Sequence, residues 1–147
     1  IGITTLILRK SAYKAEKGFD NQYNVIGDFD LVLRLSCNWK FQSVQEPLSY
    51  YRIHNDNFIL KNDFLEIEEF QKWITDQKIF LNKNFTSSLK FVNQRIIFLK
   101  TIKYIKDGKF FEALKNIFFF PISLKKIKLI IYLILPKKIL YKIKNFH

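Results

Sequence analysis

Several things are missing from this sequence of 147 residues, and each absence excludes something. There is no methionine and the first residue is Ile1, so we expect the chain to be the C-terminal part of a longer protein. Cys37 is the single cysteine, which excludes an internal disulfide and favours a reducing compartment over secretion. A secretory signal is absent, and the longest uncharged apolar run near the end, residues 129–135, is too short to span a bilayer.

Acidic residues are also missing from part of the chain. Residues 1–80 hold 10 basic and 11 acidic side chains, whereas residues 81–147 hold 15 basic and 2 acidic ones, with no acid after Glu112. The hydrophobic content of 48% excludes global disorder. We therefore predict two chemically different parts, residues 1–60 and a basic helical extension over residues 61–147.

The first part is predicted to mix strands and helices. Residues 3–8, 40–44 and 48–53 are short β-branched or alternating runs typical of strands. Residues 9–24 are polar and indicate a loop or a short helix. A helix is preferred from Asp28 or its neighbour, because acids favour a first helical turn.

The second part is predicted to be helical throughout. Its apolar residues recur at helical spacing over residues 64–74, 88–105, 110–119 and 124–143. Gly108 suits a left-handed helix C-cap, Pro121 ends the third helix and Pro136 interrupts the last one.

The groups that carry chemistry are two carboxylates and an imidazole. Asp28 and Asp30 stand at the start of the predicted helix, and His54 follows a strand-like run. Carboxylates and imidazoles remove protons from hydroxyls or hold divalent cations. Alternatively, one of the aspartates caps the helix, Asp30 forms an ordinary ion pair with Arg34, and His54 is a surface or packed histidine. The run of residues 18–20 could equally be a simple turn.

Four ordered sequence blocks favour the chemical role of these residues over the structural one. They are Arg9-Lys10-Ser11-Ala12-Tyr13, Gly18-Phe19-Asp20, Asp28-Phe29-Asp30-Leu31-Val32-Leu33-Arg34-Leu35 and Glu46-Pro47-Leu48-Ser49-Tyr50-Tyr51-Arg52-Ile53-His54. In order and spacing these blocks, over about residues 3–58, resemble the C-terminal half of the catalytic domain of family-2 glycosyltransferases.

The resemblance implies an α/β fold, namely an incomplete GT-A (nucleotide-diphospho-sugar transferase) portion followed by an α-helical tail. It implies an inverting transfer of a sugar from a nucleotide-sugar donor to a hydroxyl of a polysaccharide or lipid-linked acceptor. Asp28 matches the catalytic base, and Gly18, Phe19 and Asp20 match a loop that borders the sugars. His54 matches a residue that in some members joins the site of a divalent metal, Mg²⁺ or Mn²⁺. Most of that metal site would lie upstream of Ile1.

The chain departs from the family pattern at several positions. Lys17 replaces the first glycine of a usual Gly-Gly pair, Asn21 replaces a glutamate, and Gly27 replaces the acid before the base. A second hypothesis is therefore a non-catalytic helical module, membrane-associated or nucleic-acid-binding, that carries a decayed transferase remnant.

The basic tail, residues 122–147, has an apolar stripe flanked by lysines. The stripe consists of Leu124, Ile127, Ile130, Ile131 and Ile134. Such a segment either lies in the interface of an anionic membrane or packs its stripe against neighbouring helices. Nucleic acid is a less favoured partner, because the apolar residues dominate and no nucleic-acid module is recognisable. We expect a cytoplasmic protein, peripheral at the inner face of the plasma membrane.

Overall fold

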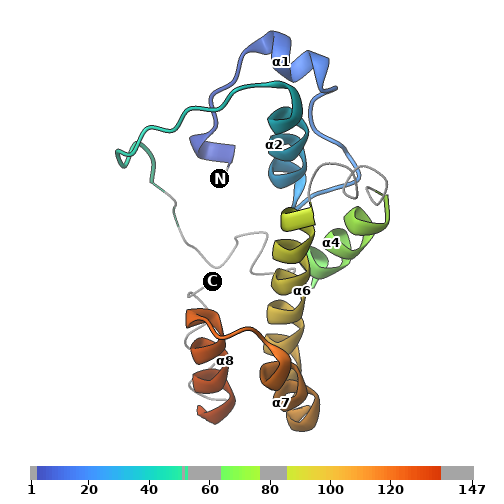
Figure 1. The fold of residues 1–147 in the computed structure, drawn as a ribbon, viewed down its shortest axis with the longest axis vertical. Helices are drawn as coiled ribbons and strands as arrows, with labels where there is room; N and C mark the ends of the chain where they lie inside the picture. Colours follow the sequence, from blue (N-terminus) through green and yellow to red (C-terminus); the bar gives the residue numbers. More distant parts are fainter. Residues whose placement is uncertain (1–2, 51, 53–63, 77–85, 137–147) are drawn as a thin grey trace. The chain divides into compact units, whose positions relative to one another are not determined.

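The computed structural model describes residues 3–50, 52, 64–76 and 86–136. The chain divides into two compact units, Ile1–Lys61 and Asn62–His147. Figure 1 shows the helices of both units. Across the described ranges, no helix combines the length and the apolar composition needed to cross a membrane.

The first unit is built on two α-helices. A 3₁₀ turn over Ile3–Thr5 precedes α1, Lys10–Ala15, and α2, Gly27–Asn38 (Figure 1). Ala12 of α1 packs with Leu31 and Leu35 of α2, and Tyr13 and Trp39 border this cluster. Of the loop or short helix predicted over residues 9–24, the structure forms a short helix followed by a loop, and the prediction of a helix beginning beside Asp28 is confirmed.

The predicted α/β fold is wrong. Residues 3–5 form a 3₁₀ turn instead of a strand, residues 40–50 have no regular secondary structure, and the parts of the chain that the structure describes contain no strand. An incomplete GT-A sheet is therefore overturned for these residues. Runs of β-branched residues become strands only when a neighbouring strand accepts their backbone hydrogen bonds, and none of the described segments provides one.

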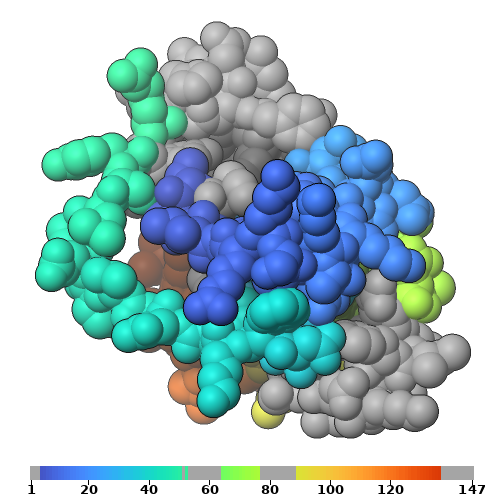
Figure 2. Space-filling model, turned by 90° about the horizontal axis from the view of Figure 1, so that it is seen from above, coloured from blue at the N-terminus to red at the C-terminus, as the bar shows by residue number. Residues whose placement is uncertain are grey.

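The segment after α2 shows the consequence of the missing sheet. Most of its side chains, those of Val44, Leu48 and Tyr50 among them, are exposed to solvent. In Figure 2 the same segment, coloured teal, projects outward with separate side chains. Alternation of apolar and polar residues alone did not give it a buried face.

The second unit is helical, as predicted. It contains α4, Leu65–Asp76, α6, Thr86–Asp107, α7, Phe110–Phe119, and α8, Leu124–Ile134. The long helix α6 contacts each of the other three, and α7 also contacts α8 (Figure 1). A bidentate ion pair joins α4 to α6, with Arg95 Nε 2.8 Å from Glu66 Oε1 and Arg95 Nη2 3.2 Å from Glu66 Oε2. Trp73 of α4 and Val92 of α6 are fully buried.

The helix ends of this unit follow the sequence signals. Gly108 has φ +76°, and the amides of Gly108 and Lys109 donate to the carbonyls of Ile105 and Tyr104. This Schellman arrangement confirms the predicted left-handed cap. α7 ends before Pro121, and the Ser123 side chain caps α8 by accepting the Lys126 amide. The predicted continuation of the last helix past Pro136 lies outside the described residues.

Candidate functional site

The candidate site is built on the turn that follows α1. Lys17 has φ +61° and Gly18 has φ +66°, so two successive residues adopt the left-handed conformation. The amide of Gly18 donates to Tyr13 O at 2.8 Å and that of Lys17 to Lys14 O at 3.1 Å, which makes a Schellman motif. Position 17, where the family pattern has a glycine, therefore requires a left-handed backbone conformation. Here a lysine adopts that conformation at an energetic cost.

Gly18 cannot be replaced without strain. A Cβ atom at this position would lie 2.6 Å from Cζ of Tyr13, well inside van der Waals contact. The Tyr13 ring also meets Phe19 edge-on, with 5.9 Å between the ring centroids. The ring of Tyr13 thus covers the turn, and the absence of a side chain at Gly18 makes room for it.

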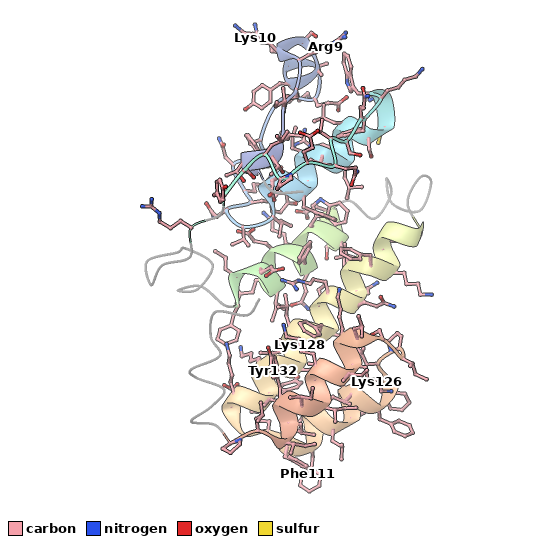
Figure 3. All side chains as sticks on the ribbon, turned by 90° about the vertical axis from the view of Figure 1, so that its left-hand side faces the viewer. Arg9, Lys10, Phe111, Lys126, Lys128 and Tyr132 are labelled. Carbon is pink, nitrogen blue, oxygen red and sulfur yellow. The ribbon has the colours of Figure 1, made fainter. Side chains whose placement is uncertain are left out.

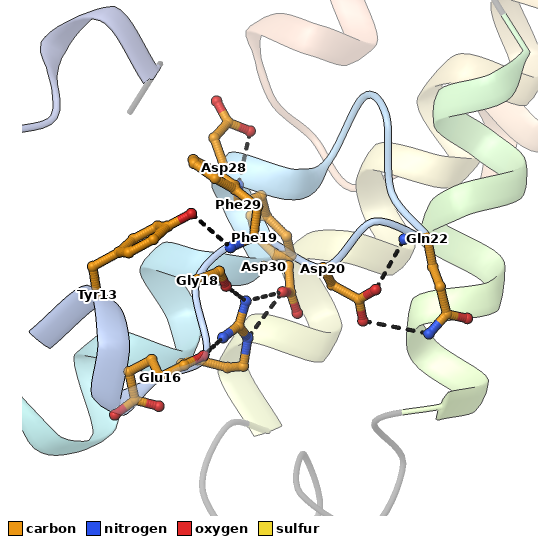
Figure 4. A network of polar contacts seen from close by, with 10 residues as sticks. Tyr13, Glu16, Gly18, Phe19, Asp20, Gln22, Asp28, Phe29 and Asp30 are labelled. Atoms are coloured by element: carbon orange, nitrogen blue, oxygen red, sulfur yellow. Dashed lines mark hydrogen bonds and ion pairs between the residues drawn. The ribbon is translucent and has the colours of Figure 1, made fainter.

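Arg34 fastens this turn to α2. Its Nε and Nη2 donate to Asp30 Oδ2 at 2.9 and 2.7 Å, Nη2 also donates to Gly18 O at 2.7 Å, and Nη1 donates to Glu16 O. Asp30 is only 2% exposed. The predicted Asp30–Arg34 ion pair is confirmed, and Figure 4 shows the Asp30 carboxylate within this network of polar contacts.

The Glu16 side chain makes a second connection between the helices. Its Oε1 accepts from Asn38 Nδ2 at 3.0 Å and from Trp39 Nε1 at 3.3 Å, so the end of α1 is tied to the end of α2. Cys37 lies beside this junction. Desolvation, and secondarily the Glu16 charge, raise the pKa of the Cys37 thiol.

Asp28, the predicted catalytic base, is half-buried in the first turn of α2. Its Oδ1 accepts the Phe29 amide at 2.8 Å. The N-cap residue of α2 is Ile26, which makes no side-chain capping hydrogen bond. The alternative that an aspartate caps the helix is therefore wrong at the N-cap position, although Asp28 accepts a hydrogen bond from one amide of the first turn. In Figure 4 the Asp28 carboxylate points away from the carboxylate of Asp30. The two aspartates therefore have different surroundings, although they are two residues apart.

The predicted substrate loop comes close to the start of α2. A Cβ built on Gly27 would lie 3.8 Å from Cδ1 of Phe19, so the Phe19 ring lies beside the residue that precedes Asp28. Phe19 is 40% exposed. Asp20 forms a local turn instead, because its Oδ1 accepts the Gln22 amide at 2.9 Å. Of the three predicted loop residues, Phe19 has the exposed side chain, whereas Gly18 and Asp20 take part in the turns of the chain.

The predicted metal ligand His54 lies outside the described residues. Within residues 3–50, 52, 64–76 and 86–136, no three His, Cys, Asp or Glu side chains are grouped so that they could hold a metal ion. The described side chains therefore supply no complete metal site by themselves, and the resemblance places most of that site upstream of Ile1.

The sequence predicted the Asp30–Arg34 ion pair but not the contacts by which Arg34 holds the turn after α1. Arg34 contacts the carbonyls of Glu16 and Gly18, which lie 18 and 16 positions before it, and no local pattern indicates these contacts. The bridging role of Glu16 was missed for the same reason. The one available signal was Lys17 at a position where the family pattern has glycine.

The α1–α2 turn thus places Phe19 beside the start of the helix that carries Asp28, and it holds them there by Arg34. The resemblance to family-2 glycosyltransferases rests on the four sequence blocks and remains a prediction. No protein-family model, curated protein or solved structure matches the chain.

Proposed function

We propose that the first unit contributes the catalytic base and a sugar-contacting loop to an inverting glycosyltransferase. The observation that carries this proposal is the position of Asp28 in the first turn of α2, with the exposed ring of Phe19 beside the preceding residue. The proposal does not depend on the α/β fold, which is overturned. It depends on the sequence blocks and on this local geometry.

The chemistry follows from the two oxygens of Asp28. The Phe29 amide holds Oδ1, and the second oxygen is available to accept a proton from an acceptor hydroxyl. As the hydroxyl oxygen attacks the anomeric carbon, its proton passes to Asp28 and the bond to the nucleoside diphosphate breaks. A carboxylate within hydrogen-bond reach of a hydroxyl can take its proton as the new bond forms.

Phe19 would contact the sugar through its ring face. An exposed aromatic ring gives a sugar an apolar surface without competing for its hydroxyls. The Arg34 contacts with the carbonyls of residues 16 and 18 fix the loop that carries this ring. The proposed donor is a nucleotide-sugar, and the proposed acceptor is a polysaccharide or a lipid-linked glycan. The proposed location is the cytoplasm, at the inner face of the plasma membrane.

The test is Asp28→Asn in the protein that contains this chain. Asparagine keeps an oxygen to accept the Phe29 amide but is not a base, so the fold should persist while transfer falls by about 10²–10⁴-fold. Transfer is measured as release of nucleoside diphosphate from a panel of UDP- and GDP-linked sugars. Asp107→Asn, which neutralises an exposed acid in the second unit, is the matched control and should transfer normally. Undiminished transfer by Asp28→Asn would remove Asp28 as the base.

A further inference from the structure

The apolar stripe predicted on the last helix faces solvent. Leu124 is 85% exposed and Ile134 is 77% exposed, and Ile127, Ile130 and Ile131 are exposed as well. The buried residue of α8 is Leu129, which is 0% exposed. Leu124, Ile127, Ile131 and Ile134 recur three or four positions apart, so they lie on one side of the helix. The alternative that this stripe packs against neighbouring helices is wrong for the described residues.

α7 adds a second exposed apolar surface. Ala113 and Ile117 are buried and so face the rest of the unit. The residues at positions 111, 114 and 118 again follow helical spacing, and all are exposed. The exposed apolar residues of α7 and of the turn after it are Phe110, Phe111, Leu114, Phe118, Phe119 and Ile122. α7 and α8 contact each other, and both carry several exposed large apolar side chains, a feature that often marks an interaction surface.

Every charged residue of α8 is a lysine. No acid follows Glu112 in the sequence. By helical spacing, Lys128 adjoins the stripe beside Leu124, and Lys126 adjoins it beside Ile130. Lys128 Nζ lies 5.5 Å from the centroid of the Tyr132 ring on the same helix, and Figure 3 shows this pair. The stripe is therefore bordered by lysine on both sides.

The lysines of α8 have different tasks. Lys126 Nζ donates to the carbonyls of Phe118 at 3.2 Å and Phe120 at 2.9 Å, and so stabilises the C-terminal end of α7. Lys125 Nζ lies 5.3 Å from the ring centroid of Phe91. The latter contact leaves the charge near the surface, where it can attract an anion.

From this arrangement we infer that the exposed face of α8 lies in the interface of an anionic lipid bilayer. An apolar stripe on a helix whose charged residues are all lysines is complementary to the acyl-chain boundary and to the negative headgroups above it. A second copy of this chain would bring lysine against lysine at the same stripe, and electrostatic repulsion would oppose it. The helix is 11 residues long, so it lies along the interface.

The test uses co-sedimentation of the chain with vesicles made of equal parts phosphatidylglycerol and phosphatidylcholine. Ile127→Gln/Ile131→Gln should lower the partition coefficient by roughly fivefold to tenfold per isoleucine, because glutamine keeps helix propensity and removes apolar area. Lys125→Gln/Lys128→Gln should lower it by roughly fivefold per lysine. Raised salt should weaken binding of the unaltered chain, and vesicles of phosphatidylcholine alone should bind it weakly.

The controls make the same changes in the first unit. Ile7→Gln replaces an exposed isoleucine, and Lys10→Gln/Lys14→Gln removes two exposed lysines from α1. Equal losses in these controls would overturn the inference. So would a concentration-dependent dimer in sedimentation velocity that Ile127→Gln/Ile131→Gln abolishes while vesicle binding is absent. Asp28→Asn should bind vesicles normally, so failure of the proposed sugar transfer and failure of lipid binding are separable.

Discussion

Replacing Arg34 by alanine should destabilise the first unit more than replacing any other exposed or half-buried residue of this unit by alanine. Arg34 donates to Asp30 and to the carbonyls of Glu16 and Gly18, so one side chain joins the turn after α1 to α2. Alanine would leave the carboxylate of Asp30 without its guanidinium, and the two carbonyls would lose a donor.

The magnitude follows from the burial of the pair. Removing one partner of a fully buried ion pair costs about 3–5 kcal/mol. Asp30 is 2% exposed, but the Arg34 side chain is 22% exposed and part of its charge is hydrated in both states. We therefore expect a loss of about 2–4 kcal/mol in the free energy of unfolding. Arg34→Lys should lose about half as much, because an ammonium keeps the charge but not the planar fork that reaches three acceptors.

The assay can report on the first unit alone. The sequence has two tryptophans, Trp39 and Trp73, and one lies in each unit. In a Trp73→Phe background, denaturant unfolding followed by tryptophan fluorescence records only the surroundings of Trp39, whose indole donates to Glu16. Arg9→Ala is the matched control, because Arg9 is exposed and caps α1 without a side-chain hydrogen bond. If Arg34→Ala shifts the free energy by no more than this control, the guanidinium does not hold the turn.

Two further predictions concern the same junction. Lys17→Gly should raise the free energy of unfolding by about 0.5–1 kcal/mol, because glycine adopts the left-handed conformation without strain. Gly18→Ala should lower the free energy of unfolding by about 2–3 kcal/mol, because the added Cβ atom would clash with Tyr13. Thermal melts of both variants test this pair of predictions, and a change in the same direction for both would refute it. Glu16→Gln should bring the raised pKa of the Cys37 thiol partway toward its usual value, because desolvation remains. The pH profile of iodoacetamide alkylation measures it, and an unmoved profile contradicts the Glu16 contribution. Since the fold disfavours the thiolate, unfolding should become easier as the pH rises past the usual thiol pKa.

The local parts of the structure were predictable because their causes are local. A helix beside Asp28, the Asp30–Arg34 ion pair and the cap at Gly108 each depend on residues within a few positions. Helical hydrogen bonds and caps form inside one segment, so spacing and end residues are sufficient to indicate them.

The strands were mispredicted because a strand is not a local structure. Residues 3–8 and 40–44 have the composition of strands, yet a ladder needs a partner that the segment cannot supply itself. The candidate site was half predictable for a related reason. Asp28, Phe19 and Gly18 were named from sequence blocks, but the anchoring of their turn by Arg34 spans 16 residues of chain and emerged only on folding.

The sequence by itself determined the helices of the second unit, the cap at Gly108, the end of α7 before Pro121 and the lysine content of α8. It also determined that Leu124, Ile127, Ile131 and Ile134 share one side of a helix, because periodicity fixes which residues are neighbours on its surface. Which side turns inward was decided by the tertiary structure, through the fit of Leu129 among the neighbouring helices. Periodicity does not tell which side of a helix packs against its neighbours. In this unit the side that carries Leu129 packs inward, and the stripe is therefore exposed.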